Sequence, residues 1–183
     1  MVFFPENYEI PSSSSNFTKF EKGDTKIRIL TSPVLGWVYW TIEPNRPVRL
    51  AMDKKPVVQP VNAKLDENGR FRPRHFWLLK IWNYNTQQIE VCEITQKNIQ
   101  GAIAAFSKES DYGHPNGYDI VINRVGEGYE TKYQVMPKVP KEVSAEIKQA
   151  DKEVEVNLNA VFTGDNPFEV SLVVEEKREI ELN

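Results

Sequence analysis

The chain has 183 residues, of which 40% are hydrophobic and 27% charged, and its formal net charge is −3. This length and composition predict one domain with appendages and a real hydrophobic core. They exclude a membrane helix, because no apolar run approaches roughly 18 residues. The first residues contain neither a basic nor a sustained apolar segment, so we expect no signal peptide.

The single cysteine, Cys92, excludes an internal disulfide and a zinc site built from cysteines. We expect Cys92 to be a small strand residue. Together these features predict an intracellular protein in a reducing compartment, with no contact to a membrane.

The first half of the chain predicts a bent strand and a long loop. Residues 1–24 form a polar leader. Residues 25–32 alternate apolar and charged side chains, and the alternation resumes after Pro33 over residues 35–42, as in a half-buried strand. Residues 43–73 contain five prolines and no clean periodicity. They predict a loop of about thirty residues, and such a loop in a compact domain is usually functional or disordered.

The second half predicts two strand pairs around a helix. The strands are expected over residues 74–84, 88–93, 118–124 and 129–136. Between the two pairs, Thr95 is the expected N-cap of an amphipathic helix of about three turns. A short helix is expected at 141–150. Residues 154–158 and 170–174 have strand periodicity and could pair with each other, with a partner or with a second copy.

This order of elements is that of the OB-fold, a small, partly open five-stranded barrel. We therefore predict an all-β protein with one helix: an OB domain over residues 25–140, the leader 1–24 before it and an acidic segment, 141–183, after it. Another small β-barrel or a mixed sandwich is the main alternative. In OB-folds the oligonucleotide site lies on strands two and three and two flanking loops, which here are residues 43–73 and 125–128.

Positive charge is concentrated in the middle of the chain. Residues 44–82 hold nine Lys/Arg against three carboxylates, a net charge of +6, whereas residues 142–183 carry −7. The tryptophans lie in or beside the basic stretch. Cations beside aromatic rings suit single-stranded nucleic acid, because the cations neutralise phosphates and the rings stack on unpaired bases. An ordinary solvated loop is the alternative.

The strand at 74–84 carries the predicted stacking surface. Phe76, Lys80, Trp82 and Tyr84 share one face, which we expect to be solvated, because burying an unpaired ammonium group is costly. Alternatively, the leader or the acidic segment covers one or two of these rings. The predicted nucleic-acid-binding residues are Trp37, Tyr39, Arg46, Arg49, Lys54, Lys55, Arg70, Arg72, Arg74, Phe76, Lys80, Trp82, Tyr84 and Lys132.

No motif predicts catalysis. The turn at 125–128 lacks the Lys-Ser/Thr of a phosphate-binding loop. His75 and His114 are isolated, and Glu90 and Glu93 point to opposite faces of a strand. We therefore expect a protein that is not an enzyme and has neither a cofactor nor a metal.

Three stretches resemble phage-type single-stranded DNA-binding proteins with one OB domain: RPRHFWLLKIWNY, EITQKNIQGAIAAF and YGHPNGYDIVINRVGEGYETKYQVMP. The resemblance covers roughly residues 25–137, and the last stretch is its most specific part. It implies binding of single strands with little sequence preference and without chemistry, in phage DNA replication or recombination inside a bacterial host. It also implies DNA contacts from the aromatic and basic residues of 74–84 and from the cations of the 43–73 loop.

The sequence departs from this family in two ways. Some relatives carry a structural zinc site, which this chain cannot build from cysteine. Many end in an acidic tail with a terminal aromatic residue, whereas this chain ends Glu179-Ile180-Glu181-Leu182-Asn183. The second departure bears on whether the acidic segment recruits replication or recombination proteins.

Two other functions stay open. One is an OB-fold module for protein–protein interaction, such as a phage accessory or anti-host factor, because fold does not determine function. The other, an enzyme such as a nuclease, is the weakest because the sequence has no carboxylate or histidine cluster. Assembly into a homo-oligomer is also left open.

Overall fold

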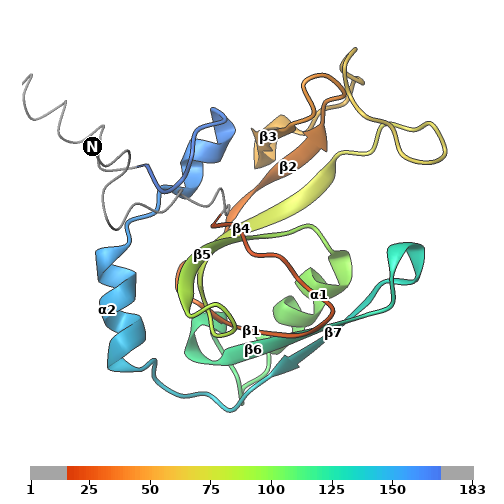
Figure 1. Ribbon diagram of the computed structural model, residues 1–183. Helices are drawn as coiled ribbons and strands as arrows, with labels where there is room; N and C mark the ends of the chain where they lie inside the picture. Colours follow the sequence, from red (N-terminus) through yellow and green to blue (C-terminus); the bar gives the residue numbers. More distant parts are fainter. Residues whose placement is uncertain (1–15, 170–183) are drawn as a thin grey trace, which may run out of the picture.

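The computed structural model describes residues 16–169, which fold around a seven-stranded antiparallel sheet (Figure 1). The strands follow the order β3-β2-β4-β1-β6-β7, and β5 pairs with β4. Their bounds are β1 Gly23–Ile29, β2 Val34–Trp40, β3 Pro47–Ala51, β4 Arg74–Asn83, β5 Gln88–Ile94, β6 Asp119–Val125 and β7 Lys132–Pro137. The α-helices in this part of the chain are α1 (Lys97–Phe106) and α2 (Ala145–Glu153), and short 3-10 turns include η1 (Met52–Lys54), η2 (Pro115–Gly117) and η4 (Leu158–Phe162).

Most predicted elements are confirmed, with changes at their ends. The bent strand is two strands, β1 and β2, separated at Pro33, and both pair with the same edge of β4. Gln96, rather than Thr95, precedes α1 as its N-cap. The loop expected over 43–73 contains a strand, β3, that the prediction missed. Residues 154–158 do not form the expected strand, and residues 170–174 lie outside the described part of the chain.

The all-β class with few helices is confirmed, but the sheet is open rather than a closed barrel. Figure 1 shows β1, β4, β5 and β6 curling around a common centre. No pairing between β5 and β7 occurs within residues 16–169. Helix α1 packs on β7 instead, and the side-chain amide of Asn98 donates a hydrogen bond to the carbonyl of Tyr133 at 2.9 Å. The helix thus occupies a backbone carbonyl on the edge of β7 that a closing strand would have paired with. The OB-fold therefore stays a prediction.

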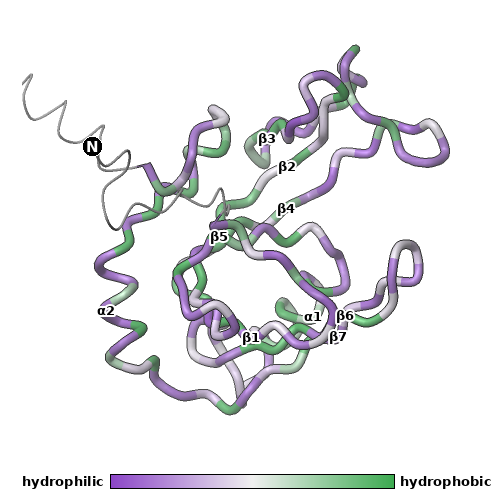
Figure 2. Tube along the Cα trace, in the orientation of Figure 1, coloured by the Kyte–Doolittle hydropathy of each residue, from purple (hydrophilic) through white to green (hydrophobic). Residues whose placement is uncertain are grey.

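The main core lies inside the curled part of the sheet. Ile27, Ile81, Ile94, Ile99 and other aliphatic side chains from β1, β4, β5, β6 and α1 form one buried cluster. Hydrophobic and hydrophilic residues alternate along several strands (Figure 2), as expected where only one face meets the core. Cys92 is fully buried in this cluster, as predicted for a small strand residue, and burial raises its thiol pKa to about 12.

The part of the acidic segment that the structure describes packs on the outer face of β4 and β5. Helix α2 begins at its N-cap Ser144, whose hydroxyl accepts a hydrogen bond from the N–H of Ile147. Ile147 packs against Trp82 and Ile89. Further along, Leu158 and Val161 of η4 pack against Phe76, Leu78, Val38 and Val91. These residues therefore cover a sheet face that the sequence pattern left open.

A buried ionic network ties β1 to β6. Arg28 donates from Nη1 to Oδ1 of Asp119 at 2.9 Å, and both side chains are at most 2% exposed. Lys26 and Lys141 lie 3.2 and 3.4 Å from the other carboxylate oxygen, and Tyr84 donates its hydroxyl to Asp119 at 2.9 Å. Burial raises the pKa of Asp119, but the hydrogen bonds from Arg28, Tyr84 and Lys26 outweigh it and hold that pKa below its ordinary value of 3.8.

Gly36 lets β2, β3 and β4 approach closely. A Cβ atom at this position would collide with the carbonyl oxygen of Leu50 and lie 2.7 Å from Cζ of Phe76. We expect Gly36→Ala to lower the free energy of unfolding by about 1–3 kcal/mol, the usual cost of overpacking. Urea unfolding measures this effect.

The matched control is Gly101→Ala, because a Cβ atom at Gly101 in α1 meets no other atom within 4 Å. This control should stabilise the protein by up to about 1 kcal/mol through helix propensity. Equal stability of Gly36→Ala and the wild type would show that the close approach is not rigid.

Within residues 16–169, none of the helices is long and apolar enough to cross a membrane.

Candidate nucleic-acid interface

Strands β2 and β3 and the first half of β4 extend away from the curled sheet as an arm (Figure 1). We define the arm as residues 34–78, which comprise β2, β3, the first half of β4 and the connections between them. Trp37 lies directly opposite Leu50 on one neighbour and His75 on the other. Directly opposed residues of antiparallel strands project to the same face. The pairings therefore assign each arm residue to one of two faces.

One of these faces, which we call the aromatic face, carries Leu35 and a row of five rings: Trp37, Tyr39, Phe71, His75 and Trp77. The ring of Trp37 lies 5.4 Å from that of His75, and the ring of Tyr39 makes an edge-to-face contact with Phe71 at 5.5 Å. Trp77 is opposite Leu35, one step further along β4. All five rings are half-buried. They follow one another along one face of the arm.

The turn that follows β3 holds Trp37 in place. Its indole N–H donates to the carbonyl of Met52 at 3.1 Å, and the ammonium group of Lys55 lies 4.4 Å from the ring centroid. A cation over an indole ring is a favourable contact. Trp37 therefore presents a stacking surface with a positive charge beside it, the pair of groups that a nucleotide needs. Trp37 and Tyr39 were predicted from sequence, whereas Phe71, His75 and Trp77 were missed.

The opposite face of the arm, and of β4 as a whole, is covered. Phe76 is fully buried and Trp82 is 5% exposed, because η4 and α2 pack over them. The prediction that these rings form an exposed stacking surface is wrong. The alternative, coverage by the acidic segment, describes the structure.

Lys80 and Tyr84 are corrected for a related reason. Lys80 is 7% exposed, and its ammonium group pairs with the carboxylate of Asp151 at 2.6 Å and with the carbonyl of the same residue at 2.8 Å. Tyr84 donates its hydroxyl to Asp119, and Lys26 lies 4.2 Å from its ring centroid. Burial and the Asp119 carboxylate raise the pKa of Tyr84 to about 12. The polar groups of both side chains therefore bind partners within the protein, and neither belongs to an exposed stacking surface.

The cations of the arm are mostly accessible. Among residues 16–169, no carboxylate lies within ion-pair distance of Arg46, Lys54, Lys55, Arg70 or Arg74, and all five side chains are exposed. Arg72 is exposed but pairs with Asp66 at 3.1 Å.

Two of the predicted cations are placed differently from these. Arg49 pairs with Glu93 and lies 5.8 Å from the ring of Phe17. Lys132 is exposed on β7, at the other end of the strand order from β3. The structure therefore does not bring Lys132 together with the arm.

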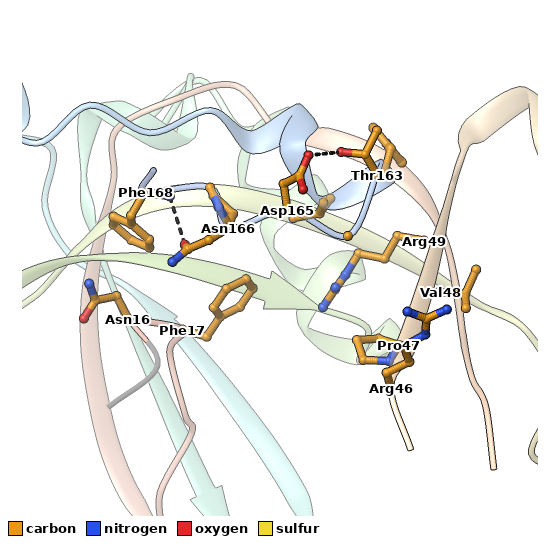
Figure 3. A pocket seen from close by; sticks show the side chains of 14 residues that line it. Asn16, Phe17, Arg46, Pro47, Val48, Arg49, Thr163, Asp165, Asn166 and Phe168 are labelled. Carbon is orange, nitrogen blue, oxygen red and sulfur yellow. Dashed lines mark hydrogen bonds between the residues drawn. The ribbon is translucent and has the colours of Figure 1, made fainter. Parts of the chain in front are cut away.

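A pocket of about 510 Å³ lies between β3, Phe17 and the turn that follows η4 (Figure 3). Figure 3 shows Arg46 and Arg49 on one side of it and Asp165, Asn166 and Phe168 on the other. Asp165 accepts a hydrogen bond from the hydroxyl of Thr163 at 2.6 Å. Because Asp165 adds negative charge and Arg49 is already paired, this pocket suits a phosphate less well than the aromatic face does. Within the described residues, no group of His, Cys, Asp and Glu could hold a metal ion.

Comparison with known proteins adds one relative. No protein-family model and no solved structure matches the chain. Over 138 residues the chain is 25% identical to a protein of Escherichia phage T5 named as a probable ssDNA-binding protein. This chain is similar to a probable phage ssDNA-binding protein. The match covers 65% of this chain and about half, 53%, of the relative. The resemblance to phage-type single-stranded DNA-binding proteins that the sequence predicted is thereby confirmed.

Proposed function

We propose that the chain binds single-stranded DNA along the aromatic face of the arm, with little sequence preference and without chemistry. The observation that carries this proposal is the stack of Lys55 over Trp37 in a row of half-buried rings. The similarity to a probable ssDNA-binding protein of phage T5 supports it. The protein would protect single strands during phage DNA replication or recombination inside the host cell.

The chemistry follows from two kinds of contact. Unpaired bases stack on Trp37 and Tyr39, and each stacked base contributes about 1–3 kcal/mol. Arg46, Lys54, Lys55 and Arg70 neutralise phosphates and release counterions. Arg74 is opposite Val38 and so projects to the other face of the arm. A duplex hides its bases in its own stack, so it gains only the phosphate contacts. The buried residues Phe76, Lys80 and Trp82 have no part in this proposal.

Salt dependence tests the proposed phosphate contacts. If four arm cations each neutralise one phosphate, the logarithm of the association constant should fall with the logarithm of salt concentration with a slope of about −2.8, at roughly −0.7 per phosphate. Fluorescence anisotropy of labelled oligo-dT, with duplex DNA as competitor, measures this slope. Removing Arg46, Lys54 and Arg70 together should make the slope shallower by about 2.

The control removes three exposed lysines outside the arm, Lys19, Lys138 and Lys152, and should leave the slope nearly unchanged. Equal slopes for the two triple variants would reject the arm as the phosphate-binding surface. Equal affinity for duplex and single strands would reject base stacking.

A specific observation favours a second candidate, a module for protein–protein interaction. The connection 52–73 carries Val57, Val58 and Val61, which are 93%, 80% and 101% exposed. Large exposed apolar side chains close together often mark a protein-binding surface. The discriminating measurement is whether free oligo-dT binds the arm. Binding supports the first candidate, and no binding at low salt favours the second.

A further inference from the structure

We propose that the aromatic face ends in a pocket, lined by Trp77, that receives one base of the bound strand. The pocket has a volume of about 330 Å³ and lies between the β1–β2 connection, β4, α1 and the loop before η2. This inference rests on the proposed function and deepens it. It names a site for a single base, whereas stacking along the row would involve several bases.

The position of Trp77 connects the pocket to the row of rings. Trp77 is opposite Leu35 and two residues from His75 on β4, so it lies on the aromatic face. Trp77 also lines the pocket, as does Leu79, two residues further along β4. A strand that follows the rings from Tyr39 past Trp37 therefore reaches the mouth of the pocket.

The size and walls of the pocket suit a nucleobase. A volume of 330 Å³ is at the lower end of the range of about 300–1,000 Å³ for small-ligand pockets. Its walls are mainly apolar, and they include Pro33, Leu79, Ile103 and Pro115 in addition to the Trp77 ring. A base has apolar faces and a polar edge, so it would bury its faces between such walls.

Polar groups at the pocket can recognise the edge of a base. His114 accepts a hydrogen bond at Nδ1 from the N–H of Asn116 at 3.3 Å. This bond assigns the proton of the neutral imidazole to Nε2, which is then a donor. The hydroxyl of Thr31 accepts from the N–H of Lys80 at 3.1 Å and keeps its own proton. Two donors favour a base that carries carbonyl oxygens, such as thymine.

The test is a substitution in α1 that places a larger side chain in the pocket. Ala104 lines the pocket, whereas its neighbour Ala105 is exposed and does not. Ala104→Leu should weaken binding of oligo-dT by about 5- to 150-fold, which corresponds to one lost base contact. Ala105→Leu makes the same change on the same helix and should leave the affinity unchanged. The salt slope should be the same in both variants, because the phosphate contacts remain.

A second variant covers the case in which Ala104→Leu fails to fold, as judged by its urea unfolding. His114→Asn keeps a side-chain oxygen for the N–H of Asn116, as Asn157 does for Asn159 at 3.2 Å, but its shorter side chain places no donor at the position of Nε2. It should weaken oligo-dT binding by about 2- to 12-fold, the equivalent of one hydrogen bond.

The outcomes separate the pocket from the proposed function. If Ala104→Leu folds and binds oligo-dT with wild-type affinity, the pocket does not receive a base. If Ala104→Leu does not fold, wild-type affinity of His114→Asn leads to the same conclusion. Either result leaves the proposal for the aromatic face intact. A wild-type protein that does not bind oligo-dT overturns both.

Discussion

Replacing Trp37 by alanine is expected to weaken the binding of oligo-dT by about 5- to 150-fold. This range corresponds to the loss of one base–aromatic stack of about 1–3 kcal/mol. Trp37 is the central ring of the aromatic face, and Lys55 lies 4.4 Å from its centroid. Removing the indole therefore removes a stacking surface and also releases the cation beside it. A direct titration by fluorescence anisotropy measures the change in Kd.

Trp40→Ala is the matched control for this prediction. Trp40 is on the same strand, but three residues away, so it projects to the opposite face. It is 46% exposed, so its removal costs little core packing. We expect its effect on Kd to be less than twofold. A loss of affinity as large with Trp40→Ala as with Trp37→Ala would show that binding does not distinguish the two faces.

Replacing Arg28 by methionine is expected to lower the free energy of unfolding by about 3–5 kcal/mol. Arg28 and Asp119 are both almost completely buried, and removing one partner of a buried ion pair leaves an uncompensated charge in the interior. This loss is a large fraction of the 5–15 kcal/mol that stabilises a typical domain. Urea unfolding gives the value.

Lys26→Met is the control for this variant. Lys26 contacts the same carboxylate, but its side chain is 35% exposed, so we expect a loss of at most about 1 kcal/mol. If Arg28→Met cost no more than Lys26→Met, the buried pair would not be a main source of stability.

The same network predicts how stability depends on pH. The pKa of Asp119 is lower in the folded protein than its ordinary value of 3.8. Its ionised form therefore stabilises the fold fully above that ordinary value, and this contribution is lost as the pH falls through the lowered pKa. The stability difference between the wild type and Asp119→Asn should accordingly be largest near neutral pH and shrink in acid. A constant difference over that range would contradict the assignment.

Periodicity predicted the positions of most strands. Burial alternates along β2 and β7, as expected where one face meets the core, whereas β4, β5 and β6 are buried on both faces over most of their length. β3 was missed because it lies among prolines and has no clean alternation. It is an edge strand that begins at Pro47, a position where proline costs no ladder hydrogen bond. Closure of the barrel could not be read from the order of elements, because α1 packs on β7 and β5 pairs only with β4 among the described residues.

The candidate site was predicted only in part, for a physical reason. Alternation shows which residues of a strand share a face, but it does not show what covers that face. Lys80 was expected to face solvent because burying an unpaired ammonium group is costly, and the structure avoids that cost by pairing it with Asp151, which is 71 residues away. Likewise, the contact of Trp37 with His75 depends on strand register, which the sequence does not reveal. The accessible cations of the 43–73 loop, by contrast, could be predicted from charge alone.

The most direct test of the central claim is a tryptophan-fluorescence titration with oligo-dT, comparing the wild type with Trp37→Phe and using duplex DNA as the control. Phenylalanine retains a ring for stacking but removes the reporter. We predict saturable, salt-sensitive quenching of the wild type by single strands alone, and loss of a large part of that quenching in Trp37→Phe while oligo-dT still binds. No quenching of the wild type at low salt, or equal quenching in both proteins, would contradict a single strand lying on the aromatic face.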